Sequence, residues 1–118
     1  MKIYLAIPYS FNPEFSFKIA NIITAKLMSK GHVVFSPISH SHPVADYLPD
    51  NLRTDSNWWM KMDLPFVEWA DELHVVCIGD TGHFLIQESK GVQMEIAHAK
   101  FHSKDIKIYD YYYDERRN

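Results

Sequence analysis

Four short apolar runs are spaced along the chain: KIYLAI at 2–7, HVVFSPI at 32–38, ELHVVCI at 72–78 and KIYDYYY at 107–113. Each run is shorter than a typical buried helix and is rich in β-branched or aromatic residues. This pattern is typical of strands that are covered on both faces. The hydrophobic pattern therefore predicts a buried parallel sheet of four to five strands.

Segments with helical periodicity separate these runs. Apolar residues recur at helical spacing from 14 to 30, and further helices are predicted over 57–70 and 89–102. The segment 36–56 contains three prolines and many polar residues, and 79–88 is polar and contains glycine. Both stretches are predicted to be loops, and long loops in a compact domain are often functional.

The alternation of strands and helices determines the expected fold class. Strands that alternate with helices form parallel sheets through right-handed crossovers, with helices on both faces. The 118 residues are long enough for one hydrophobic core. We therefore predict a single α/β domain over 1–118, a Rossmann-like, flavodoxin-like three-layer sandwich that binds its ligand beyond the carboxyl ends of the strands.

Charge and composition exclude several classes of partner. Twelve Lys and Arg against fifteen Asp and Glu give a net charge of −3, so no polymeric nucleic acid is expected to bind. The apolar N-terminal run is too short to span a membrane and has no convincing signal-peptide cleavage site. The single cysteine, Cys77, lies in an apolar run and fits a reduced interior thiol, which indicates a cytoplasmic protein.

Three segments that follow strands carry the candidate chemistry. These are IPYS at 7–10, SPISHSHP at 36–43 and GDTGHFLIQESKG at 79–91. In a parallel sheet the carboxyl ends of the strands meet at one edge, so these three segments should converge there. The sequence thus predicts one site built from three distant segments.

The start of the helix at 89–102 is the most informative part of this site. Ser89 is placed to be its N-cap, and the free N–H groups of its first turn suit an anionic group. Gly91 would let a ligand approach the backbone, and Glu95 lies on the same helix face. Because capped helices with an early glutamate are common, this pattern alone also fits a plain cap with a surface glutamate.

A family resemblance shifts the weight toward a functional site. The stretches IYLAIPYS and SKGVQMEIAHA, with Asp63 and Asp71 eight residues apart before ELHVVCI, resemble the nucleoside 2-deoxyribosyltransferase superfamily, which includes the nucleoside 5′-monophosphate N-glycosidases. The resemblance spans nearly the whole chain and implies a homodimer or a larger homo-oligomer. Asp71 directly precedes a strand, where a local hydrogen bond is expected.

The resemblance also implies roles for individual residues. Glu95 matches the nucleophile that attacks C1′ of the sugar, and Asp63 matches the residue that handles the proton of the departing base. Tyr4 matches a tyrosine that positions the glutamate. Ser89 stands where the monophosphate hydrolases carry a serine that contacts the 5′-phosphate and where the transferases carry an aspartate. A serine hydroxyl can donate to a phosphate, so the sequence favours a 5′-nucleotide over a free nucleoside.

The chain departs from the monophosphate hydrolases near the first strand. Pro8 replaces a serine, and no arginine follows in IPYSFNP, so Ser10 or a loop histidine is expected to replace these phosphate contacts. Trp58 or Trp59 could stack on a nucleobase, although core packing of both explains them equally well. The further candidates for substrate binding are Pro8, Tyr9, Ser10, His40, His42 and Trp59.

Neither a metal nor a cofactor is expected. Glu95, His98 and His102 form one helical stripe, but the sequence has no HExxH motif and no paired CxxC motif. It also has no GxGxxG and no GxxxxGK[ST] phosphate loop, which argues against dinucleotide-dependent oxidoreductases and ATPases.

Two functions stay open at this stage. The first is cleavage of the N-glycosidic bond of a (deoxy)nucleoside 5′-monophosphate by a glutamate nucleophile, either as a hydrolase or as a transferase between bases. The alternative is a non-catalytic module that senses or sequesters a nucleotide derivative in the same pocket. The tail tyrosines are further candidates for a subunit interface: Tyr109, Tyr111, Tyr112 and Tyr113.

Overall fold

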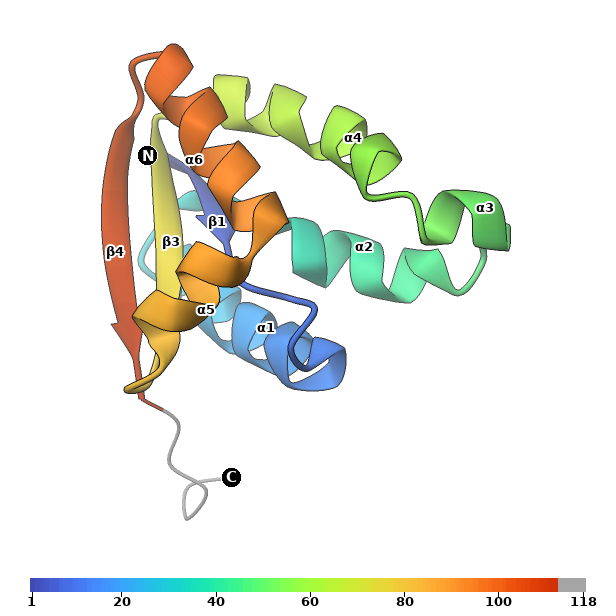
Figure 1. Cartoon of the computed structure of the whole chain (residues 1–118). Helices are drawn as coiled ribbons and strands as arrows, with labels where there is room; N and C mark the ends of the chain where they lie inside the picture. The colour runs from blue at the N-terminus through green and yellow to red at the C-terminus, as the bar shows by residue number, and fades with distance from the viewer. Residues whose placement is uncertain (113–118) are drawn as a thin grey trace.

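A parallel sheet forms the centre of the computed structural model, which describes residues 1–112 (Figure 1). The strands are β1 (Lys2–Ala6), β2 (Val33–Phe35), β3 (Glu72–Ile78) and β4 (Asp105–Tyr111). Their order across the sheet is β2-β1-β3-β4, and every neighbouring pair is parallel. The predicted α/β fold is therefore confirmed, with a four-stranded sheet in the described part of the chain.

Six helices accompany the sheet within the same residues. They are α1 (Pro13–Ser29), α2 (Pro37–Ala45), α3 (Asp50–Arg53), α4 (Ser56–Trp69), α5 (Gly82–Glu88) and α6 (Lys90–Phe101). None of the helices found in residues 1–112 is long and apolar enough to cross a membrane. The long helices α1, α4 and α6 match the three helices that periodicity predicts.

The prediction of loops at 36–56 and 79–88 is wrong, because these stretches hold α2, α3 and α5. Two of the prolines that suggested a loop occupy positions that a helix tolerates. Pro37 is the first residue of α2, where its missing N–H is not needed, and Pro49 directly precedes α3. Ser36 caps α2 by accepting a hydrogen bond from the backbone N–H of Ser39.

Helices cover both faces of the sheet, which confirms the three-layer sandwich. The core between α1 and the sheet consists of Ile3, Leu5, Ile7, Ile19, Ala20, Ile23, Leu27, Val76 and Ile78. The core beneath α4, α5 and α6 consists of Tyr4, Ala6, Val67, Ala70, Leu73, Val75, Cys77, Ile86, Val92 and Ala99. Successive residues of β1 alternate between the two cores, as strand geometry requires. This alternation places Tyr4 on the face that α4 and α6 cover.

Asp71 joins the amino ends of β1 and β3. Its carboxylate accepts a hydrogen bond from the backbone N–H of Lys2 at 2.8 Å, and its own N–H donates to the Lys2 carbonyl at 2.8 Å. The expectation of a local hydrogen bond is therefore wrong, since the partner lies 69 residues away in the sequence. Asp71 serves the register of the sheet at the end opposite to the expected site.

The tail tyrosines differ in their surroundings. Tyr109 and Tyr111 are partly buried and pack against the core on the α1 face, so they contribute to the fold of this chain. Tyr112 is 70% exposed. Tyr113 lies outside the described residues. A subunit interface at this end of the chain stays a prediction.

Candidate active site

A pocket of about 800 Å³ opens at the carboxyl edge of the sheet. The turn after β1, the helices α2 and α4 and the start of α6 supply most of its walls, as the predicted convergence of segments requires. Its lining includes these sequence-predicted residues: Pro8, Tyr9, Ser10, His42, Trp59, Asp63, Ser89, Gly91 and Glu95.

Glu95 is the most deeply buried acid of this pocket, with only 4% of its surface exposed. It lies in the second turn of α6, and its Oε2 accepts a hydrogen bond from the phenol of Tyr4. Tyr4 is fully buried in β1, behind the pocket wall, and its ring packs against Phe35 of β2. A buried tyrosine of strand β1 therefore holds the Glu95 carboxylate in a fixed orientation.

Asp63 provides the second buried carboxyl, on α4, with 8% of its surface exposed. Burial raises the pKa of Asp63 to about 6. Burial also raises the pKa of Glu95 to about 8; the hydrogen bond from Tyr4 opposes this effect, and the charge of Asp63 adds to it. The two carboxyls interact, so they titrate as a pair that retains about one proton between pH 6 and pH 8.

Ser89 and Gly91 shape the pocket at the start of α6. The hydroxyl of Ser89 accepts a hydrogen bond from the backbone N–H of Val92 at 3.2 Å, so the predicted N-cap is present. Its hydroxyl hydrogen can still be donated to a ligand. A Cβ at Gly91 would meet the Met60 side chain at 3.6 Å, an ordinary van der Waals distance. Packing therefore does not require glycine at this position.

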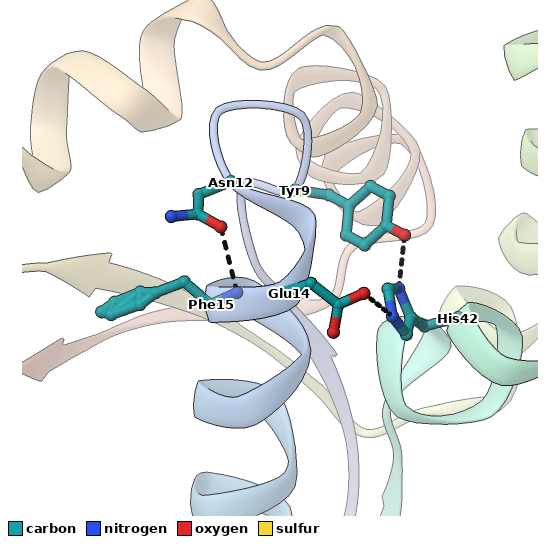
Figure 2. Close-up of polar contacts among 5 residues, drawn as sticks. All are labelled: Tyr9, Asn12, Glu14, Phe15 and His42. Atoms are coloured by element: carbon teal, nitrogen blue, oxygen red, sulfur yellow. Dashed lines mark hydrogen bonds and ion pairs between the residues drawn. The ribbon is translucent and has the colours of Figure 1, made fainter.

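A hydrogen-bonded group of three side chains closes the wall between α1 and α2 (Figure 2). The Tyr9 hydroxyl lies 2.6 Å from Nδ1 of His42, and Nε2 of His42 lies 3.0 Å from the Glu14 carboxylate. The ring of Phe17 stacks on His42 at a centroid distance of 4.4 Å. These contacts fix the position of His42 at the pocket. Burial, followed by the charges of Glu14 and Asp46, raises the pKa of Tyr9.

The turn that carries Tyr9 is itself fixed by two short-range contacts. The hydroxyl of Ser16, fully buried in α1, donates to the Pro8 carbonyl at 2.7 Å. The Asn12 side chain caps α1 by accepting from the backbone N–H of Phe15 at 3.2 Å (Figure 2). Pro8 and Ser10 therefore belong to a well-defined turn at the pocket wall.

Of the predicted residues His40 and Trp59, only Trp59 lines the pocket. His40 is exposed on α2, lies near the ring of Phe35 and the hydroxyl of Ser41, and is not among the residues that line the pocket. The structure thus does not bring this predicted residue to the site. Trp59 lines the pocket, and its indole N–H donates to the Arg53 carbonyl at 2.9 Å. Its neighbour Trp58 packs edge-on against it.

Charged residues that sequence reasoning missed also line the pocket. Arg53 at the end of α3 and Lys90 at the start of α6 bring two full positive charges, and Arg53 pairs with Asp50. Sequence reasoning missed Arg53 because its helix was predicted as a loop. Lys90 could have been found, because it directly follows the predicted cap Ser89. The acids of the lining are Glu14, Asp46, Asp63, Glu88 and Glu95.

The helical stripe of Glu95, His98 and His102 divides between two places. Glu95 faces Tyr4 in the pocket, whereas Nε2 of His98 lies 3.0 Å from the carboxylate of Glu68 on α4. Neither histidine lines the pocket. The three residues do not form one metal site, and the histidines belong to a different cluster.

Comparison with solved structures places the fold. The 2-deoxyribosyltransferase of the psychrotolerant bacterium Bacillus psychrosaccharolyticus matches with a TM-score of 0.64 at 21% identity, over 99% of this chain and 88% of that chain. The 2-desoxiribosyltransferase from Leishmania mexicana matches with a TM-score of 0.61 at 18% identity, over 92% of this chain and 63% of that chain. The chain thus shares the fold of these deoxyribosyltransferases, which confirms the predicted resemblance at the level of the fold.

Sequence comparison assigns the particular family. The chain belongs to the family described as "Domain of unknown function (DUF1937)", whose model matches residues 1–111. No curated protein matches the chain.

Proposed function

We propose that this protein cleaves the N-glycosidic bond of a nucleotide, a deoxynucleoside 5′-monophosphate, with Glu95 as the nucleophile. The observation that carries the proposal is the pair of buried carboxyls, Glu95 and Asp63, in one pocket, with Tyr4 bonded to the first. Glycosyl transfer needs one carboxylate that attacks and one group that moves protons. The 2-deoxyribosyltransferase names of both structural neighbours agree with this chemistry.

The proposed reaction has two steps. The Glu95 carboxylate attacks C1′ as the bond to the base breaks, and Asp63 donates a proton to the departing base. The product of this step is a glycosyl ester on Glu95. In the second step Asp63, now ionised, accepts a proton from a water molecule that attacks C1′, and the Glu95 carboxylate is released.

The pair of carboxyls carries the number of protons that this sequence requires at neutral pH. The pair retains about one proton there, mostly on Glu95, whose pKa is about 8 against about 6 for Asp63. The reaction needs this proton on Asp63 instead. A sugar that acquires positive charge at C1′ favours ionised Glu95, so the approach to the transition state itself moves the proton toward Asp63. The hydrogen bond from Tyr4 acts in the same direction because it favours the Glu95 carboxylate.

The phosphate of the substrate would lie at the start of α6. The Ser89 hydroxyl and the free N–H groups of the first helical turn are donors, and Lys90, next to Ser89, adds positive charge. This lysine takes the place of the arginine that is missing from the IPYSFNP turn. Trp59, whose indole N–H donates to the Arg53 carbonyl, also lines the pocket and offers an aromatic surface for the base.

Hydrolysis and transfer differ only in the group that attacks the ester. In the transferase variant of this proposal, a second base enters the pocket after the first has left. The proposed enzyme needs no cofactor in either case. We expect it to act in the cytoplasm as a homodimer or larger homo-oligomer. Light scattering of the purified protein measures this oligomeric state directly.

The rival function is a module that binds a nucleotide derivative without converting it. It would use Ser89 and Gly91 but would have no need for two buried carboxyls. Burial of a carboxyl opposes folding unless its environment compensates, and both groups have raised pKa values here. A pocket that tolerates two such groups is more readily explained by catalysis.

The decisive experiment is chromatography of purified protein incubated with the common 5′-monophosphates and their nucleosides, in ribo and deoxy forms. Free base should be released from a deoxynucleoside 5′-monophosphate, faster than from the matching nucleoside. Glu95→Gln should lower the turnover by at least about 10³-fold, because the nucleophile is lost. A second base added to the reaction should give a new nucleotide only if the protein is a transferase.

Glu72→Gln is the matched control. Glu72 is also a partly buried carboxylate, but it pairs with His74 on β3 and does not line the pocket. This variant should keep wild-type turnover. Thermal stabilisation by a nucleotide without any product would support the binding module instead, and full turnover by Glu95→Gln would refute the assigned nucleophile.

A further inference from the structure

A second cluster of side chains lies on α4 and α6 outside the pocket. It consists of Glu68 on α4, His98 on α6 and His102 at the end of α6. Nε2 of His98 lies 3.0 Å from one oxygen of the Glu68 carboxylate, and Nε2 of His102 lies 3.9 Å from the other. The ligand atoms of all three residues lie within 4.8 Å of one another.

The arrangement follows from helix geometry. Residues four apart lie on the same helix face, and the rings of His98 and His102 have a centroid distance of 4.6 Å. The helices α4 and α6 lie side by side over the sheet (Figure 1). This packing brings the Glu68 carboxylate within 3.9 Å of a ring nitrogen of both histidines. Because the two helices are firmly packed on one core, the three side chains meet without any loop.

These atoms are close to the geometry of a metal centre. Zinc binds histidine nitrogen and carboxylate oxygen at about 2.0–2.2 Å, so neighbouring ligand atoms in a tetrahedral site lie roughly 3.3 Å apart. The distances from the Glu68 carboxylate to His98 and His102, 3.0 and 3.9 Å, lie on either side of this value.

The cluster is accessible to an ion from solution. The exposed fractions of the side chains are 47% for Glu68, 25% for His98 and 31% for His102. Two histidines and one carboxylate are a ligand set that zinc uses when solvent occupies the fourth position. The two histidine nitrogens also disfavour calcium and magnesium, because these ions prefer oxygen ligands.

We propose that Glu68, His98 and His102 form a binding site for a divalent transition metal ion, zinc by ligand chemistry, that links α4 to α6. The ion bridges the two helices that also carry Asp63 and Glu95, which precede Glu68 and His98 by five and three residues. Its effect is to hold the two helices together from the outside. The site is separate from the pocket and does not depend on the proposed reaction.

The test is calorimetric titration of the untagged, chelator-treated protein with Zn²⁺. One equivalent should bind and should raise the melting temperature. Loss of an outer-shell partner of a bound metal already weakens binding about 10–100-fold, so loss of a direct ligand should weaken it at least about tenfold. His98→Ala, His102→Ala and Glu68→Gln should each have this effect. Bound Co²⁺ should give a visible absorption band typical of a low coordination number. The same variants should lose this band.

His83→Ala is the matched control, since His83 is an exposed histidine on α5 outside the cluster. This variant should bind Zn²⁺ as the wild type does. Absence of Zn²⁺ binding to the wild type, or equal binding by the double variant His98→Ala/His102→Ala, would overturn the proposal. Circular dichroism of each variant shows whether the fold is intact. Because the measurement is binding, its failure leaves the proposed glycosidase untouched.

Discussion

The helices α4 and α6 each carry two functional groups, and the two pairs lie in opposite environments. Asp63 and Glu95 face the pocket with at most 8% of their surface exposed, whereas Glu68 and His98 lie partly in solvent. In the buried pair, burial raises both pKa values. In the exposed cluster, the hydrogen bond from His98 lowers the pKa of Glu68; desolvation opposes this effect, and nearby positive charges add to it. A glutamate therefore has a raised pKa on one side of this helix pair and a lowered pKa on the other.

Among the changes that test this contrast, removal of the proton donor should have the largest effect on activity. Asp63→Asn should lower kcat by about 10²–10⁴-fold, because general acid–base catalysis contributes factors of this size. In the wild type, kcat/KM should fall below about pH 6, where both carboxyls of the pair are protonated, and above about pH 8, where both are ionised. Steady-state kinetics across this range measure both limits.

The variant should also change the shape of that profile. With Asp63 replaced, only Glu95 titrates, so the remaining activity should rise to a plateau and the alkaline fall should disappear. The acidic limb of the variant reports Glu95, whose pKa should drop because the neighbouring negative charge is gone. An unchanged bell-shaped profile would show that Asp63 is not the acid.

Removal of the Tyr4 hydroxyl should have a smaller effect. Tyr4→Phe keeps the ring that packs against Phe35 but removes the donor to Glu95. A hydrogen bond to a charged group contributes about 1.5–3 kcal/mol, so kcat/KM should fall about 10–100-fold. Since the donor favours ionised Glu95, the alkaline limb should also move to higher pH. A fall in activity with no movement of that limb would indicate a purely structural role for Tyr4.

The smallest expected effect is on stability, and it should have opposite signs in the two regions. The pKa of Glu95 is raised in the folded state, so the folded protein binds more protons and loses stability as the pH rises from about 4.5 to about 8. Glu95→Gln removes this loss. The free energy of unfolding should therefore fall less between pH 5 and pH 8 in the variant than in the wild type, by at least about 1 kcal/mol.

Glu68→Gln provides the opposite sign in the same experiment. The lowered pKa of Glu68 stabilises the folded protein above the unfolded pKa, and this stabilisation is lost as the pH falls. The variant should thus lower stability at neutral pH and approach the wild type in acid. Urea unfolding in the presence of a chelator, at several pH values, measures both variants. Equal pH dependence in the two variants would contradict the contrast between the regions.

The sequence predicts those parts of the molecule whose cause is local. Strands β1 and β3 follow from unbroken apolar runs, and the helix α1 follows from its apolar period. The Ser89 cap follows from residue type and position, because N-capping depends on neighbouring backbone groups only. These predictions need no knowledge of the tertiary structure.

Other features depend on contacts that the sequence does not show. The helix α5 has no side-chain cap, and it packs so closely on β3 that a Cβ at Gly82 would lie 2.5 Å from the Cys77 sulfur. Arg53 reaches the pocket through α3, a single turn of helix within the stretch that was predicted as a loop. The partnership of Glu68 with His98 depends on how α4 and α6 pack, and helix periodicity within α6 instead suggested Glu95 as the partner.

The close contact between Gly82 and Cys77 gives the molecule a built-in reporter of its own motion. Cys77 is the single thiol of the chain, it is 3% exposed, and burial together with Asp110 raises its pKa. Because α5 packs directly on the sulfur, lifting of α5 from β3 would expose it to a thiol reagent, which needs both access and the thiolate. The rate of alkylation therefore counts openings of the segment that leads directly into Ser89, and its slowing by a nucleotide would measure how firmly an occupied pocket locks that segment in place.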